Sequence, residues 1–421
     1  MKPTNSHTGI YLTNLTDKEF ILKGLLKNKL PEIPVDLSSM KGVLYSSITI
    51  DKMIAEELRH DHFLIHTDEN ESLGTMSSGQ QRKALLNHLI AQQPDYMILD
   101  DLYSNIDKLT QQQIAGTLTE LSENILMIQL FFRQSDVLPF IENICTVNEK
   151  NEIVSVQHSS DFLKAKELDI SFRGFKLPDT YSGNHNGFDI PVRMKAVSVK
   201  YGDKPVLDNI NWTIRKGEFW QLTGPNGSGK STLVSMISGD NPKAYGQDIT
   251  LFGRKKGSGE TIWDIKKQIG YFTPLMIHQF TRADSVENMI ISGLNDSVGL
   301  YVTPTDLQKD TAKFWLDVLG ETFRKKNFQQ LSVGQQRMVM VARAMVKHPP
   351  LLILDEPTIE LDDNNSRLFI EMINAIAMEK QVAIIYISHR DETGLLPEKI
   401  FELIKTGNGY TGIEKSDIRL T

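Results

Sequence analysis

The chain has 421 residues, 40% of them hydrophobic and 24% charged, which is an ordinary composition for a soluble protein of two or three globular domains. Its net charge of −7 argues against a nucleic-acid partner, and its single cysteine, Cys145, excludes an internal disulfide. No apolar run approaches the ~20 residues that a membrane span requires, so any work at a membrane needs a separate membrane partner.

Residues 76–107 form the first segment with a recognisable chemical pattern, MSSGQQRKALLNHLIAQQPDYMILDDLYSNID. The pattern predicts a polar loop with a glycine, an amphipathic helix, a turn, and a buried strand that ends in Asp100 and Asp101. Two carboxylates after such a strand are typical of the metal-binding wall of a nucleotide site. Residues 1–75 contain no glycine-rich phosphate loop, so this wall lacks a phosphate-binding cradle.

Two neighbouring segments have simpler interpretations. RHDHFLIH at 59–66 brings His60, His62 and His66 together, but without acids in a fixed frame a solvated or partly buried run is favoured over a metal site. FRGFKLPDTYSGNHNGFD at 172–189 is rich in Gly, Asn and Pro without clear periodicity. We interpret it as a linker between a first domain, 1–171, and a second domain, 190–421.

Residues 224–232 supply the cradle that the first domain lacks. Their sequence, GPNGSGKST, matches the phosphate-loop pattern G-x-x-x-x-G-K-[ST], after the strand-like EFWQLT and before the helix-like TLVSMIS. In such a loop backbone N–H groups surround the phosphates, the lysine contacts the β- and γ-phosphate oxygens, and the serine after it ligates Mg²⁺. We expect nucleotide contacts from Gly224, Pro225, Asn226, Gly227, Ser228, Gly229, Lys230, Ser231 and Thr232.

Residues 331–362, LSVGQQRMVMVARAMVKHPPLLILDEPTIELD, repeat residues 76–107 without a gap at a spacing of 255 positions. The glycine, the QQR triplet, the proline and the acidic pair all keep register, and in the second copy the pair is Asp355 and Glu356. Repetition of this quality predicts two related domains in tandem. Alternating strand and helix patterns predict that both are α/β.

The first domain has only a remnant of a phosphate loop. A shift of 211 positions aligns the Pro at 242 with the Pro at 31 and places Glu19 where the second domain has Lys230. The loop then reads TNLTDKEF (13–20), without glycine and with a carboxylate where phosphate would lie. An anion there would repel a nucleotide, so we expect the first domain to be degenerate.

These motifs resemble those of the ATP-binding cassette (ABC) ATPases, strongly over 191–421 and weakly over 1–75. GRKKGSGETIWDIKKQIGYF (253–272) is further similar to soluble tandem cassettes of molybdenum transport. The resemblance implies two ABC-type P-loop NTPase domains that pair head to tail, with ATP between the phosphate loop of one and the signature loop of the other. The segment 76–82 resembles such a signature. The expected contributors to the ATP site of the second domain are therefore Ser77, Ser78, Gly79 and Gln80, which gives one working site per chain.

The resemblance also implies roles for residues of the second domain. Tyr201 resembles the aromatic residue that stacks on adenine, and Asp355 resembles the acid that holds Mg²⁺ together with Ser231. Glu356 resembles the general base that activates the attacking water, and His389 resembles the γ-phosphate contact. With Lys230 they form the expected catalytic set. Asp362 resembles the loop acid that reaches the opposite cassette.

Several positions depart from the family pattern. In the first domain Asp101 stands in place of the glutamate, and Phe132, which cannot hydrogen-bond a phosphate, falls at the position of His389. In the second domain Pro274 occupies the usual place of a glutamine that touches Mg²⁺, and Gln279 comes five residues later. The first set of changes suggests a retired site. The second leaves the route of coupling to a membrane partner open.

The expected reaction is attack of water on the γ-phosphate of ATP, with Mg²⁺ as cofactor. The favoured role is the ATP-binding subunit of an importer, paired with an integral membrane permease. Without the apolar core of a signal peptide, the chain is expected in the cytoplasm, at the inner face of the plasma membrane when bound to its permease. The alternative is a soluble non-transport ABC protein, either a translation factor or a nucleotide-dependent regulator. The short linker and the negative charge count against RNA binding.

Overall fold

The structure, a computed structural model, describes residues 6–28, 33–60, 65, 72–104, 106–164, 176–177, 188–390 and 392–416. The chain divides into two compact units, residues 1–169 with 360–364 and residues 170–359 with 365–421. The limits expected from the sequence, 1–171 and 190–421, stay predictions. Most of the proposed linker, 172–189, lies outside the described residues.

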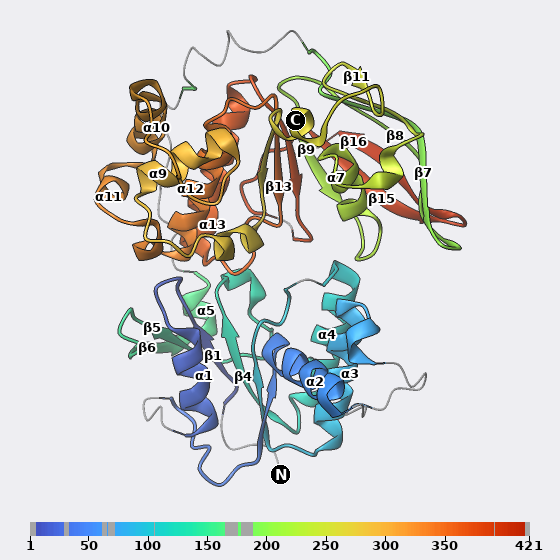
Figure 1. The fold of residues 1–421 in the computed structure, drawn as a ribbon. Helices are drawn as coiled ribbons and strands as arrows, with labels where there is room; N and C mark the ends of the chain where they lie inside the picture. The colour runs from blue at the N-terminus through green and yellow to red at the C-terminus, as the bar shows by residue number, and fades with distance from the viewer. Residues whose placement is uncertain are drawn as a thin grey trace. The chain divides into compact units, whose positions relative to one another are not determined.

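The first unit is built on a six-stranded sheet of order β2-β3-β4-β1-β5-β6, in which β6 alone runs antiparallel to its neighbour (Figure 1). The strands are β1 (Thr8–Tyr11), β2 (Gly42–Tyr45), β3 (Tyr96–Leu99), β4 (Leu126–Phe131), β5 (Asn143–Val147) and β6 (Ile153–His158). The helices are α1 (Lys18–Leu26), α2 (Ser47–His60), α3 (Ser78–Ala91), α4 (Lys108–Leu121) and α5 (Ser159–Phe162). Strands β3 and β4 are buried along their whole length, as parallel strands covered on both faces should be.

The second unit has a ten-stranded sheet of order β11-β10-β7-β8-β16-β15-β9-β14-β13-β12. Its strands are β7 (Val192–Tyr201), β8 (Lys204–Ile214), β9 (Phe219–Thr223), β10 (Asp248–Leu251), β11 (Arg254–Lys255), β12 (Ile269–Phe272), β13 (Leu351–Asp355), β14 (Ala383–Ile387), β15 (Lys399–Thr406) and β16 (Gly409–Ser416). Its helices are α7 (Lys230–Ile237), α8 (Ile262–Lys266), α9 (Val286–Ser292), α10 (Asp306–Leu319), α11 (Glu321–Arg324), α12 (Val333–Met345) and α13 (Asp363–Met378). Strands β9, β14, β13 and β12 are parallel, so their carboxyl ends and the loops that follow meet at one edge.

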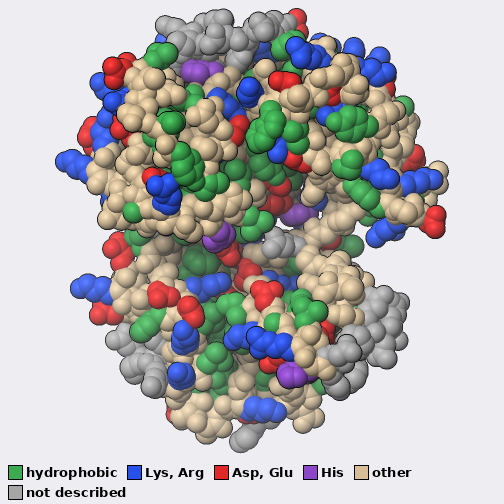
Figure 2. Space-filling model, viewed as in Figure 1, with side chains coloured by type: hydrophobic (Ala, Val, Ile, Leu, Met, Phe, Trp, Pro, Cys, Tyr) green, Lys and Arg blue, Asp and Glu red, His purple; other side chains and the backbone are tan. Residues whose placement is uncertain are grey.

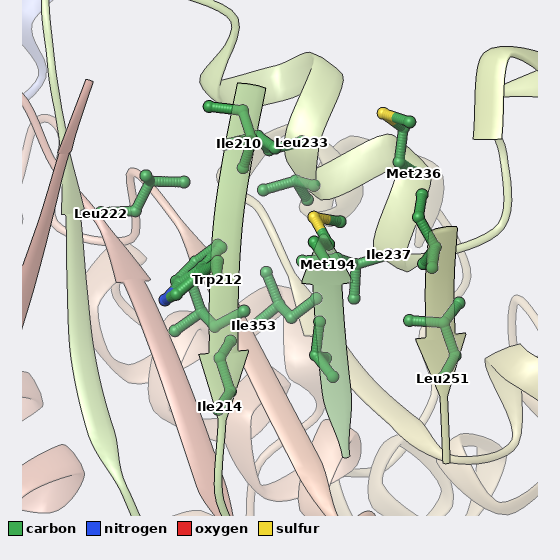
Figure 3. Packing of buried hydrophobic residues seen from close by; sticks show 14 of the residues in the cluster. Met194, Ile210, Trp212, Ile214, Leu222, Leu233, Met236, Ile237, Leu251 and Ile353 are labelled. Atoms are coloured by element: carbon green, nitrogen blue, oxygen red, sulfur yellow. The ribbon is translucent and has the colours of Figure 1, made fainter. Parts of the chain in front are cut away.

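A buried apolar cluster fixes the position of α7, the helix that follows the expected phosphate loop. Leu233, Met236 and Ile237 of α7 pack against residues of β7, β8 and β10 (Figure 3). Trp212 of this cluster stacks on Phe401 of β15 with 4.4 Å between ring centroids. Burial of large apolar side chains is worth about 2 kcal/mol each, so the helix and the loop before it rest on a rigid base.

The two sheets differ at one side. Within the described residues of the first unit no strands correspond to β7, β8, β10 and β11, which form the antiparallel part of the second sheet. The α/β tandem organisation predicted from the repeat is confirmed, and the second unit is the more complete of the two.

The surface gives few other functional indications. On the face that Figure 2 shows, Lys and Arg side chains alternate with Asp and Glu. No helix among the described residues is long and apolar enough to cross a membrane. In the part of the chain that the structure describes, no three His, Cys, Asp or Glu side chains are grouped as metal ligands. His60 ends α2, whereas His62 and His66 of the histidine run lie outside the described residues.

Candidate nucleotide site

The loop between β9 and α7 has the backbone geometry of a phosphate cradle. Gly224 has a φ of 147° and Gly229 a φ of 96°, values that residues with a side chain rarely adopt. A Cβ at Gly224 would lie 2.9 Å from Oγ of Ser228, and one at Gly229 would lie 2.6 Å from Cδ2 of Leu207. Glycine is therefore required at both positions, because any side chain would strain the loop or fill it.

The helix after this loop begins without a side-chain cap. Gly229 is the N-cap of α7, and it has no side chain to accept the first N–H groups of the helix. The fully buried hydroxyl of Ser228 makes no hydrogen bond with the described residues. Lys230, 7% exposed, donates from Nζ to the carbonyl oxygens of Gly224 at 2.8 Å and Pro225 at 3.0 Å. These groups fit a polyanion such as a triphosphate.

Two acids stand at the end of β13, as the sequence predicts: Asp355 is its last residue and Glu356 follows it. Burial raises the pKa of Asp355, while the hydroxyl of Tyr271, which donates to Oδ2 at 3.2 Å, and the nearby Lys230 ammonium lower it; the net shift is upward. Ser231 and Asp355 offer a hydroxyl and a carboxylate, which are oxygen ligands of the kind that Mg²⁺ takes. The donor types therefore fit this ion.

Glu356 has the properties of a general base. Burial raises its pKa to about 8, and the neighbouring Asp355 adds to the shift. Its φ of 50° is unusual for a residue with a side chain. Nε2 of His389 lies 3.4 Å from Oε1 of Glu356, an oxygen that makes no hydrogen bond within the described residues. The structure thus brings the predicted pair, Glu356 and His389, together.

Tyr201 lies at the turn between β7 and β8 and is 46% exposed. Its hydroxyl accepts a hydrogen bond from Nδ2 of Asn241 at 2.9 Å, and Nζ of Lys243 lies 6.0 Å from the ring centroid. Asn241 in turn donates to Oγ of Ser235 on α7. The ring is therefore tied to the helix of the phosphate loop, and its exposure fits a stacking surface for a base.

Both copies of the signature motif begin a helix in the same way. Ser77 caps α3 and Ser332 caps α12, each in a capping box with the glutamine three residues later. Ser77 and Gln80 are exposed, and Ser78 and Gly79 are partly buried. Gly334 in the second copy is buried, so the two loops differ in accessibility although their backbones agree.

The register of the first unit corrects the expected position of its lysine. Strands β1 and β9 occupy equivalent places beside β4 and β14, and their pairings correspond at a shift of 212 rather than 211. At this shift Lys18, the first residue of α1, stands where Lys230 stands. Glu19 was therefore placed wrongly. It is an exposed residue that forms an ion pair with Lys23. The shift of 211 positions relied on a weak proline match. That match lies beyond the loop, where the two units differ in their number of residues.

The loop before Lys18 is occupied by its own side chains. Thr13 N–H donates to Oγ1 of Thr16 at 3.1 Å, and Asp17 caps α1 by accepting from the N–H of Phe20 at 3.0 Å. A carboxylate thus takes the helix N–H that a phosphate would take. The expected loss of the cradle is explained, although the repelling carboxylate is Asp17 and not Glu19.

The acids of the first unit are neutralised internally. Lys18 Nζ lies 3.2 Å from Oδ1 of Asp100, whose other oxygen accepts from the hydroxyl of Ser46 at 2.7 Å. Burial lowers the pKa of Lys18, but Asp100 and other carboxylates outweigh it and raise the pKa overall. Asp101 pairs with the buried Arg82 at 3.1 Å. Both carboxylates that would face metal and water therefore have a protein partner.

Phe132 occupies the place of His389, as predicted. In the second unit Leu354 pairs with Tyr386, and in the first unit Leu99 pairs with Gln129. Counting three residues from each partner along the strand gives His389 and Phe132.

Asp362 belongs to the short segment 360–364 that forms part of the first compact unit. Its Oδ2 accepts a hydrogen bond from the N–H of Asn14 at 2.8 Å, and its own N–H donates to Oδ1 of Asn14 at 3.0 Å. Nδ2 of Asn14 donates to the carbonyl of Glu360 at 2.8 Å. Asn14 corresponds to Asn226 of the phosphate loop at the shift of 212, so this residue of the degenerate loop has a protein partner too.

Sequence reasoning overlooked two residues that the structure places at these sites. Tyr271, in the IGYF segment, donates to Asp355 and is itself partly buried. Lys18 was overlooked because no glycine marked the loop before it. Pro274 begins a short 3₁₀ helix, Pro274–Gln279, that ends with the exposed Gln279.

Comparison with known proteins shows the family of the chain. A family model described as ABC transporter matches residues 207–359, which include the phosphate loop, the second signature and the acid pair. The ABC transporter ATP-binding protein ModF of Escherichia coli (strain K12) is 37% identical over 335 residues, which span 75% of this chain and 67% of that protein. The zinc uptake system ATP-binding protein ZurA of Listeria innocua is 34% identical over 47% of this chain and 76% of its own length.

Among solved structures, cbiO1 from Clostridium perfringens, part of the ABC transporter complex cbiONQ, is 26% identical with a TM-score of 0.47, over 55% of this chain and 90% of that one. The identity to ModF over most of both chains is the decisive match. This chain belongs to the family of ABC transporter ATP-binding proteins, which are ATPases.

Proposed function

We propose that this chain is the ATP-hydrolysing subunit of an ABC importer with one working ATP site. The observation that supports it is the contrast between two equivalent edges. In the second unit the uncapped helix α7, which begins with Lys230, follows β9. The paired Glu356 and His389 follow β13 and β14, and β14 lies between β9 and β13 in the sheet. In the first unit the equivalent loop and acids are bonded to the protein itself.

In the proposed reaction the chain binds the triphosphate and positions one water. Backbone N–H groups of residues 226–232 and the Lys230 ammonium hold the phosphates, and Tyr201 stacks on the base. Mg²⁺, held by Ser231 and Asp355, would neutralise phosphate charge when bound. Glu356 accepts a proton from the attacking water. His389 contacts the γ-phosphate.

The signature of the first unit completes this site in our proposal. Ser77, Ser78, Gly79 and Gln80 would meet the γ-phosphate of the nucleotide that Lys230 holds, and so stabilise the charge that develops during transfer. A degenerate half is then retained because its signature is still needed. Chain pairing beyond this intramolecular arrangement is not required.

The proposed partner is an integral membrane permease, reached from the cytoplasmic side of the plasma membrane. Several relatives are named as ATP-binding proteins of transporters or uptake systems, which supports this role. Molybdate is the first solute to test, because residues 253–272 are similar to tandem cassettes of molybdenum transport.

The test is purification of the tagged chain from gently solubilised membranes, followed by mass spectrometry. Stoichiometric recovery of a permease that Lys230→Ala also retains would support the importer. Recovery of ribosomes, or of no membrane protein at all, would favour the soluble alternative. Molybdenum content of cells lacking the protein, compared with cells restored by wild type or by Glu356→Gln, tests the solute.

A further inference from the structure

A buried carboxylate lies close to the proposed catalytic edge and has no role in the chemistry above. Glu392 is 3% exposed and follows β14 in the loop that also contains His389. Burial of a carboxylate costs free energy unless hydrogen bonds satisfy it. Here the hydroxyl of Thr358 donates to Oε1 of Glu392, and the hydroxyl of Ser388 is shared between the same oxygen at 3.3 Å and the carbonyl oxygen of Arg390 at 3.2 Å.

These two hydroxyls come from different loops. Thr358 follows Glu356 in the loop after β13, and Ser388 precedes His389 in the loop after β14. One carboxylate oxygen of Glu392 therefore joins the loop of the general base to the loop of the histidine.

Neighbouring contacts make this junction rigid. The N–H of Glu356 donates to the carbonyl of Ile387 at 3.0 Å, and the hydroxyl of Thr358 lies 3.3 Å from that of Tyr386. Thr358 is 2% exposed and Tyr386 is fully buried. The hydroxyl of Ser388 also accepts from the N–H of Arg390 at 3.0 Å. Water therefore has little access to the group that links the loops.

We propose that Glu392 is a positioning residue for ATP hydrolysis, which sets the separation of Glu356 and His389 by binding the hydroxyls of Thr358 and Ser388. The inference rests on the proposed function, because that function assigns the roles of Glu356 and His389.

The backbone of Glu356 gives the physical reason. Its left-handed φ of 50° persists only where the surroundings impose it. The bond to Ile387 restrains the residue at its N–H, and the Thr358–Glu392 contact restrains the chain two residues later. A displacement of about 1 Å in a reacting group can lower a rate about 100-fold. Loss of Glu392 lets both loops relax and moves Glu356 away from its place beside the histidine.

The test compares steady-state ATP hydrolysis by full-length variants. Glu392→Ala should lower kcat about 10- to 100-fold and change KM for MgATP less than about threefold, because Glu392 lies outside the phosphate loop. Glu392→Gln should recover most of kcat, since its amide oxygen can accept the same two hydroxyl hydrogen bonds. Thr358→Val keeps the side-chain volume but removes one donor, and it should lower kcat about tenfold. This variant decides the matter if Glu392→Ala fails to fold.

Glu218→Ala is the matched control. Glu218 is a partly buried carboxylate of the same unit that accepts from Nε1 of Trp220 and Nζ of Lys399, both at 2.9 Å. It precedes β9, at the opposite end of that strand from the phosphate loop. The control should lower the melting temperature and leave kcat unchanged.

Two results would overturn the positioning role. The first is a wild-type kcat in both Thr358→Val and folded Glu392→Ala. The second is a Glu392→Gln variant that is as slow as Glu392→Ala. Failure of the proposed function itself would look different. Glu356→Gln would then hydrolyse ATP at the wild-type rate, whatever the variants at Glu392 do.

Discussion

The loops after β1 and β9 have the same length and the same place in their sheets, but their hydrogen bonds are arranged in opposite ways. In the second unit three glycines leave the start of α7 without a side-chain cap. In the first unit Asp17 caps α1, and Lys18 pairs with Asp100. A lysine at the right position is thus not enough for a phosphate site. The start of the helix must also lack a capping carboxylate such as Asp17.

Other features are the same in both units. Asp101 and Glu356 have φ values of 55° and 50°, and both signature helices begin with a capping box. These features shape the backbone, whereas the lost ones would touch a nucleotide. If the first signature completes the site of the second unit, as proposed, the first unit keeps the features that its fold and its signature need.

The largest expected difference concerns the two lysines. Lys230→Ala should weaken MgATP binding about 100-fold or more, because charge-assisted hydrogen bonds to the phosphates are lost. Lys18→Ala should leave it unchanged. Isothermal titration calorimetry measures both, and wild type should bind one ATP per chain. Two ATP molecules per wild-type chain would contradict the single site.

Substitutions of the equivalent acids Glu356 and Asp101 should differ nearly as much in their effect on ATP hydrolysis. Glu356→Gln should bind MgATP but hydrolyse it at least about 100-fold more slowly, the usual cost of losing a positioned base. Asp101→Asn should lower the rate far less, because Asp101 pairs with Arg82 and is not the base; any loss should accompany a lower melting temperature, since the buried Arg82 loses its carboxylate partner. A phosphate-release assay measures both rates. If Asp101→Asn bound MgATP normally but hydrolysed it as slowly as Glu356→Gln, the base would have to be assigned to the first unit.

The two signature loops provide the next comparison, but their glycines are not equivalent. A Cβ at Gly334 would lie 2.1 Å from Oδ1 of Asn365, whereas one at Gly79 would lie 3.2 Å from Cγ2 of Thr110. Substitution at Gly334 would therefore damage its own unit, whatever the function of the loop. The first helical residues, Ser78 and Val333, form a better pair.

A glutamate is favourable at the start of a helix, so both Ser78→Glu and Val333→Glu should fold. If the first signature faces the working site, Ser78→Glu should lower the ATPase rate at least about tenfold through repulsion of the triphosphate. Val333→Glu should have little effect. The reverse result would mean that two chains pair through their second units, and equal loss in both would argue against a single asymmetric site.

Much of this organisation could be predicted from sequence because the motifs depend on local order. The repeat at a spacing of 255 identified two α/β units, and GPNGSGKST lies between a strand and a helix as its pattern requires. The acid pair and His389 follow buried strands, and parallel pairing brings strand ends together.

The remaining features depend on three-dimensional register. The alignment of the degenerate loop was wrong by one residue because it used a distant proline, and only strand pairing shows that Lys18 and not Glu19 replaces Lys230. Tyr271 and Glu392 make side-chain hydrogen bonds with residues 84 and 34 positions away in sequence. No local pattern encodes such contacts.

The smallest expected effect concerns the stability of the first unit. Asp100 has a side chain only 2% exposed, and Lys18, 25% exposed, is its cationic partner. Lys18→Met should destabilise the unit by about 2 kcal/mol, less than for a fully buried pair because the lysine reaches solvent. For a unit of this size that is a melting-temperature decrease of about 4–8 °C, measurable by circular dichroism without nucleotide.

Two variants separate the ion pair from other effects of the substitution. Lys18→Met combined with Asp100→Asn should recover most of the loss, because the amide needs no counter-ion and can still bind the hydroxyl of Ser46. Lys23→Met on the same helix removes an exposed pair with Glu19 and should not change the melting temperature measurably. If Lys18→Met were no less stable than Lys23→Met, Lys18 would not neutralise Asp100 in solution. The loop between β1 and α1 would then be the main obstacle to nucleotide binding in the first unit, and glycines at Leu12, Leu15 and Asp17 together should raise the affinity for MgATP.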